Sequence, residues 1–137
     1  MMLGEYRLAR QGGGRGAFAH VYVEVVPWDG QGSQVITAVD HNDRTALPEQ
    51  DPEWFEAAME GCQKSLNALR IEGIESNTYQ VQIIRIIYTI ADTNPDAIRA
   101  ASFLATAAAF GAQARFRLAF QNGWKVISNE QHPPPSA

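Results

Sequence analysis

The spacing of apolar and polar residues predicts β-structure in the first part of the chain. Residues 17–26 alternate between two sides, one of them made only of alanine and valine, which is typical of a strand with one buried face. Pro27 closes this strand. Residues 34–39 follow a glycine-containing turn and predict an antiparallel return strand. Residues 11–16, Gln-Gly-Gly-Gly-Arg-Gly, predict a flexible loop before the first strand because glycine weakens regular strand structure.

Two helices are predicted, each opening with a cap residue followed by proline. Asp51 and Pro52 begin the first helix and Gly73 ends it. Its apolar residues recur at steps of three and four, which predicts one buried stripe. The stripe consists of Phe55, Met59, Cys62, Leu66 and Leu69.

The second helix is predicted between Asn94 and Gly111 and is rich in alanine. Small side chains at Ala101, Ala105, Ala108 and Ala109 would allow close packing against a sheet or the first helix. Between the helices, residues 79–91 predict a long strand whose alternation changes phase near Ile83 and Ile84, so we expect a β-bulge there.

The remaining elements complete a single predicted domain, residues 1–128. Residues 115–120 and 124–127 flank an Asn-Gly pair and predict a β-hairpin. Residues 129–137 are rich in proline and predict a disordered tail. This order predicts an α+β fold, with a mainly antiparallel sheet and two helices covering one of its faces.

Composition and charge narrow the classes of function. The chain has 137 residues, 45% of them hydrophobic, with a net charge of −4 and one cysteine, Cys62. The apolar runs are too short to cross a membrane, no secretion signal is recognisable, and nothing requires a disulfide, so we expect a cytoplasmic protein. Residues 40–75 hold nine acidic and three basic side chains, a net charge of −6. Any contact with RNA would therefore have to be local.

No catalytic, nucleotide-binding or metal-binding pattern is present in the sequence. The phosphate-binding motif of GTPases, a nucleophile elbow and zinc-ligand spacing are all missing. Asp92 and Asp96, with Asp40 and Asp43, do not have the spacing of a cation-binding loop. Cys62 lies on the predicted apolar stripe and is expected in the core. We therefore expect no enzyme activity and no bound cofactor, metal or nucleotide.

The beginning of the chain has a distinctive order of aromatic, glycine and histidine residues. Tyr6, the Gly-Gly-Gly-Arg-Gly loop, Phe18 and the pair His20-Val21 lead into a strand that ends at Pro27. This order resembles the opening of domain IV of elongation factor G, and the later order of elements, over roughly residues 6–111, is also similar. The resemblance implies the fold of the second domain of a small-subunit ribosomal protein, which includes a left-handed βαβ crossover.

The resemblance also implies a site at the tip of the domain. In that family two loops meet there and enter the decoding region of the ribosome, which implies the ribosome or a structured RNA as partner. The first loop matches residues 12–16, and the second matches residues 91–96. The candidate contact residues are Gly12, Gly13, Gly14, Arg15, Gly16, His20, Asp92, Thr93 and Asn94.

Each candidate also has a purely structural interpretation. The glycine loop could be a simple connection, His20 lies within a predicted strand, and Asn94 is explained by helix capping. The second loop also has no histidine, which the family usually carries near its centre. The alternative function is therefore a module that binds a protein partner or forms a homodimer. It predicts an exposed apolar patch on residues 81–90 or on the 115–127 hairpin.

Overall fold

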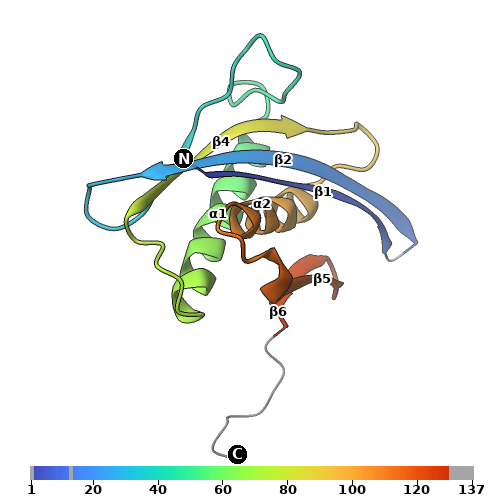
Figure 1. The fold of residues 1–137 in the computed structure, drawn as a ribbon. Helices are drawn as coiled ribbons and strands as arrows, with labels where there is room; N and C mark the ends of the chain where they lie inside the picture. The colour runs from blue at the N-terminus through green and yellow to red at the C-terminus, as the bar shows by residue number, and fades with distance from the viewer. Residues whose placement is uncertain (1, 13, 130–137) are drawn as a thin grey trace, which may run out of the picture.

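The computed structural model describes residues 2–12 and 14–129, so Gly13 and residues 130–137 of the predicted tail lie outside the described residues. The chain forms a four-stranded sheet, two helices and a separate two-stranded sheet (Figure 1). In chain order the elements are β1 (Met2–Gly12), β2 (Arg15–Pro27), β3 (Gln34–Thr37), α1 (Pro52–Ile71), β4 (Tyr79–Ile87), α2 (Pro95–Ala109), a short 3-10 helix (Gln113–Arg115), β5 (Phe116–Phe120) and β6 (Trp124–Ser128).

The larger sheet has the strand order β1-β2-β4-β3. β1, β2 and β4 pair antiparallel, whereas β3 lies parallel to β4 at one edge. Both helices lie on the same face of this sheet (Figure 1). The predicted α+β architecture, with two helices on one face of a mainly antiparallel sheet, is therefore confirmed.

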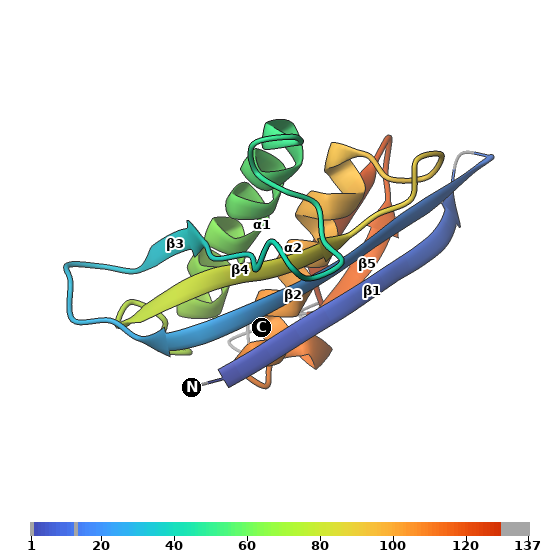
Figure 2. The same cartoon turned by 90° about the horizontal axis from the view of Figure 1, so that it is seen from above.

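The connection from β3 through α1 to β4 is a left-handed crossover. Figure 2 views the molecule from the sheet side, where β3 and β4 run in the same direction and α1 lies behind the sheet. When the view is reversed so that the helices face the observer and the strands point up, β4 lies to the left of β3. Most βαβ units have the opposite hand, so this feature is a specific property of the fold.

Two strand predictions were wrong or incomplete. β1 was not predicted, because glycine and two arginines obscure the alternation of its residues. β3 does not return along β2, since the second edge of β2 is occupied by the longer strand β4. After β2, Trp28 N donates a hydrogen bond to Thr78 O (2.8 Å), next to the start of β4. The chain then passes the end of β4, and β3 forms on the far edge of that strand.

The described residues of the glycine-rich segment, 11–12 and 14–16, form the end of a long hairpin rather than the predicted loop before a strand. Gln11 pairs with Gly16 and Gly12 pairs with Arg15, so both strands extend into the segment. The prediction failed because pairing between β1 and β2 holds Gly12 and Gly16 in strands despite the weak intrinsic preference of glycine for strands. Gly14 has a φ angle of 79°, a conformation that a tight hairpin turn requires and glycine adopts without strain.

The predicted bulge in β4 is confirmed. Val23 pairs with Ile83 whereas Tyr22 pairs with Arg85, which leaves Ile84 as the extra residue. The strand ends at Ile87 rather than Ala91, because the chain then turns and Thr93 N donates to Thr89 O (3.2 Å).

The helix termini follow the predicted signals with one exception. The Asn94 side chain accepts a hydrogen bond from Ala97 N (2.9 Å), and Gly111 ends α2 with a φ angle of 70°. Asp51 occupies the N-cap position of α1, but its side chain makes no capping hydrogen bond. On the apolar stripe of α1, Met59 is 37% exposed, whereas the other four residues are buried.

The core lies between the sheet and the two helices. The alanines and valines of β2 face α2, and Ala101 and Ala105 are fully buried on that helix. Two glycines permit the closest approaches: Gly4 of β1 lies against the backbone of α2, and Gly61 of α1 lies against Arg99. The β5–β6 hairpin forms as predicted, and Asn129 beyond it donates from its backbone N to Arg115 O (2.7 Å).

Candidate functional site

The two loops singled out from the sequence meet at one end of the domain, which we call the tip. Phe18 N donates a hydrogen bond to Asp92 O (2.9 Å), and Thr93 Oγ1 donates to Phe18 O (2.7 Å). These bonds use the edge of β2 beyond the point where its pairing with β4 stops. The loop between β4 and α2 is therefore fixed against the β1–β2 hairpin.

Thr93 holds this loop in a compact turn. Its hydroxyl accepts from Thr89 N (2.9 Å) while donating to β2, and Thr89 Oγ1 accepts from Asp92 N (3.2 Å). Because the Thr93 hydroxyl is half-buried and occupied on both sides, its contribution is to position the loop. Asn94 is likewise occupied as the cap of α2.

Arg15 and Asp92 present their side chains at the tip. Both residues are exposed. A Cβ atom at Gly16 would lie 3.2 Å from Asp92 Oδ1, so the absence of a side chain at Gly16 lets the carboxylate approach the hairpin. Among the described residues, no carboxylate lies within ion-pair distance of the Arg15 guanidinium, which leaves it open to an external anion.

A third segment, the β5–β6 turn, completes the tip. Asn122 and Gly123 have φ angles of 61° and 139°, and a Cβ at Gly123 would lie well under 3.0 Å from Asp96 Oδ2. The turn is thus held close to the first turn of α2. The three segments enclose a groove of about 710 Å³, which we call the tip groove. Its lining includes Arg15, Asp92, Asn94, Asp96, Asn122 and Trp124.

Charge is distributed unevenly around the tip. Residues 6–19 carry three arginines and no acid. Arg10 pairs with Ala17 near the turn, and the Arg7 guanidinium lies 5.2 Å from the centre of the Phe18 ring. On the opposite side, Asp92 and Asp96 line the tip groove. The hairpin side of the tip is therefore cationic and the helix side is acidic.

The structure places His20 away from the tip groove, on the sheet face opposite the helices. Its Nε2 atom lies 2.7 Å from Glu5 Oε2, and its ring stacks on Tyr22 with 4.4 Å between centroids. Its side chain is only 14% exposed. The remaining glycine candidates lie in the hairpin, with Gly12 at the end of β1 and Gly14 in the turn, while Gly13 lies outside the described residues.

The other chemical candidates lie apart from the tip. Cys62 is fully buried between the helices, and burial raises the pKa of its thiol to about 12. Asp43 is bound elsewhere, with its Oδ1 atom 3.4 Å from Arg85 Nη2. Within residues 2–12 and 14–129, no group of three or more His, Cys, Asp or Glu side chains is arranged to hold a metal ion. Neither helix in this part of the chain has the length and apolar character needed to cross a membrane.

Sequence reasoning found the first two segments of the tip but missed the third. The Asn-Gly pair predicted the β5–β6 turn, yet no local signal indicates where a hairpin will pack. Gly123, which has no Cβ to meet Asp96, is the residue that permits the contact.

Comparison with solved structures supports the fold. No family model matches the sequence, and no curated protein is significantly similar to it. Among solved structures, a crystal structure of a protein from Thermus thermophilus is similar, with a TM-score of 0.65 and 16% sequence identity. The similarity covers 91% of this chain and 23% of the Thermus chain. The chain thus has the fold of one part of a much longer bacterial protein.

Proposed function

We propose that this chain is an elongation factor G domain IV-like domain that contacts the ribosome or a structured RNA through its tip. The observation that carries the proposal is the direct hydrogen bonding between the hairpin and the second loop at Phe18, Asp92 and Thr93. Two segments more than seventy residues apart, both selected by the resemblance, are joined at one end of the domain.

The fold supports the same proposal. The left-handed crossover and the alanine-rich second helix are features that the resemblance implies. Fold similarity alone assigns no function, so the tip has to carry the functional argument.

The charge distribution indicates how the tip would meet RNA. The exposed Arg15 guanidinium has the planar, forked geometry that binds a phosphate through two hydrogen bonds. The glycines beside it add no side chains that would keep a phosphate away from the backbone. Asp92 and Asp96 repel phosphate, so we infer that the phosphate bound at the tip lies on the hairpin side, beside Arg15, and that Asp92 contacts amino or hydroxyl groups.

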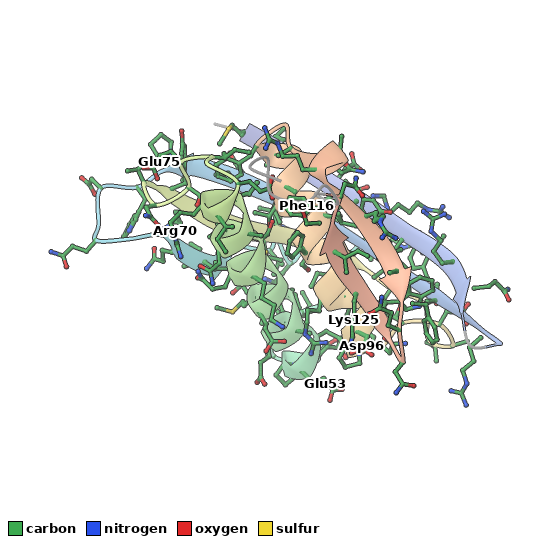
Figure 3. All side chains as sticks on the ribbon, turned by 90° about the horizontal axis from the view of Figure 1, so that it is seen from below. Glu53, Arg70, Glu75, Asp96, Phe116 and Lys125 are labelled. Atoms are coloured by element: carbon green, nitrogen blue, oxygen red, sulfur yellow. The ribbon has the colours of Figure 1, made fainter. Side chains whose placement is uncertain are left out.

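We expect the purified domain to co-sediment with small ribosomal subunits at low salt. The substitution Arg15→Ala should weaken this binding about tenfold, which corresponds to about 1.4 kcal/mol of binding free energy. Losing one phosphate contact should also lower the slope of log K against log salt by roughly one. Sedimentation across a salt series measures both effects. Arg70→Ala is the matched control, because it removes the same charge at the opposite end of the domain (Figure 3).

Equal effects of the two substitutions would show that only net charge matters, and no binding of the wild type at low salt would refute the proposal. Arg70 makes one exposed hydrogen bond, to Asn77 (3.2 Å), so its removal should leave the fold intact.

A second candidate function, a protein-interaction or self-associating module, is favoured by apolar side chains near the tip. Ile90 is 96% exposed, Phe120 43% and Tyr88 38%. The patch does not extend along β4, because that strand is paired on both edges and Val81, Ile83 and Ile86 are buried. Reversible dimerisation of the domain without any ribosome binding would support this function over the first.

A further inference from the structure

A second groove lies next to the tip, between α1, α2 and β6. It has a volume of about 470 Å³, and we call it the lateral groove. Phe103, Trp124 and Val126 supply apolar lining, while Lys64, Arg99 and Lys125 supply three cationic side chains. Figure 3, which views the helix side, shows Lys125 near Asp96 at the end of the β5–β6 hairpin.

The two lysines of the lateral groove are free to bind an external anion. Within the described part of the chain, neither Lys64 nor Lys125 has a carboxylate at ion-pair distance. Both are exposed. Arg99 differs, because it binds Glu60 and also Asp96 (2.9 Å). Burial lowers the pKa of Arg99, but the two carboxylates raise it by more, so the guanidinium stays charged.

The lateral groove adjoins the tip groove. Four residues line both of them: Asp96, Asn122, Gly123 and Trp124. The Trp124 ring lies at the junction, half-buried, and contacts Phe120 edge-to-face with 5.2 Å between centroids. The two grooves therefore lie side by side, with Trp124 between Arg15 of the tip groove and the two lysines of the lateral groove.

We propose that the lateral groove binds the backbone of a single-stranded RNA segment that continues from the tip. Lys64 and Lys125 neutralise phosphates on the two sides of the groove, and the Trp124 ring stacks on a base between them. Lysines that flank an aromatic ring in a groove form the arrangement that tracks single-stranded nucleic acid. The proposal rests on the function proposed for the tip and assigns the path of the RNA beyond it.

The lateral groove is tested with a fluorescein-labelled single-stranded RNA of twelve nucleotides, titrated with the full chain over a salt series. We expect the double variant Lys64→Gln/Lys125→Gln to bind this RNA about tenfold more weakly than the wild type does. The slope of log K against log salt should become shallower by about 1.4 in this variant, which is the value for the loss of two phosphate contacts on a single strand. Arg44→Gln/Arg117→Gln is the control, since both arginines are exposed and lie outside the two grooves.

Base stacking is tested separately by tryptophan fluorescence. Unlabelled RNA should quench the wild-type emission, and Trp124→Phe should remove most of the quenching while Trp28 and Trp54 still emit. Thermal melting of each variant checks that it is folded. A binding curve of Lys64→Gln/Lys125→Gln identical to that of the arginine control would overturn the proposal.

The experiment distinguishes an error in the proposal for the lateral groove from an error in the proposal for the tip. Loss of affinity in Arg15→Ala without loss in Lys64→Gln/Lys125→Gln would overturn the lateral groove alone. An absence of RNA binding by the wild-type chain would overturn both proposals. Poly-glutamate could also displace the RNA, and labelled poly-glutamate could bind directly with equal affinity. These two results together would indicate that the groove binds an acidic protein segment, and they would overturn the assignment to RNA.

Discussion

Gly4→Val will lower the free energy of unfolding by about 3 kcal/mol or more. Gly4 lies where β1 crosses α2, and a Cβ there would overlap the backbone carbonyl oxygen of Ala105. It would also lie 2.7 Å from Ala109 N and 2.9 Å from Ala109 Cβ. Backbone atoms of a helix cannot move aside as the end of a flexible side chain can, so either the strand or the helix must shift.

Urea unfolding monitored by circular dichroism measures this effect. Ala9→Val is the control, because it places the same residue on the same strand at an exposed position. We expect the control to change stability by less than about 0.5 kcal/mol. Similar losses in the two variants would show that strand content, rather than the contact with α2, decides stability.

Gly61→Ala will also destabilise the domain, although helix propensity predicts the opposite sign. Alanine is favoured over glycine within a helix by about 1 kcal/mol. A Cβ at Gly61, however, would lie well under 3.0 Å from the carbonyl oxygen of Arg99 and 3.1 Å from Ser102 Cβ. Separating α1 from α2 loses buried contacts along both helices, so we expect a net loss of about 2 kcal/mol.

Asn67→Ala is the control for this substitution, because Asn67 is exposed on α1 and alanine raises helix propensity there as well. We expect it to be neutral or to stabilise by a few tenths of a kcal/mol. A gain in stability from Gly61→Ala would contradict the close packing of the helices.

Since Lys64 and Arg99 lie on the two helices, Gly61→Ala should also weaken RNA binding in the lateral groove.

Local signals in the sequence predicted the elements better than their pairing. Asn94 and Gly111 bound α2 as expected, and the change of phase at Ile83 and Ile84 located the bulge. Each of these signals depends on a few neighbouring residues. The left-handed crossover, by contrast, was implied only by the resemblance, because general rules of chain topology favour the other hand.

The failures concern contacts between distant segments. β3 was assigned to β2 because a short turn joins them, yet β4 has more apolar residues to bury and occupies that edge. The glycine segment was interpreted as a loop because its pairing partner, β1, was not recognised. The packing of the β5–β6 turn against Asp96 depends on the absence of a side chain at Gly123, which no pattern around residue 123 indicates.

Directed hydroxyl-radical cleavage from a tethered iron chelate tests most directly whether the tip faces ribosomal RNA. Ile90→Cys places the probe beside the tip, and Ile71→Cys places it at the end of α1 near Arg70, at the opposite end of the domain (Figure 3). Both isoleucines are highly exposed, 96% and 82%, so the two substitutions are matched. Burial and the raised pKa of Cys62, about 12, keep the native thiol unreactive near neutral pH.

We predict cleavage of small-subunit RNA at defined positions from the Ile90→Cys probe, little or none from the Ile71→Cys probe, and loss of the first pattern in Arg15→Ala. Equal cleavage from both probes, or cleavage from the Ile71→Cys probe alone, would contradict an orientation in which the tip meets the RNA.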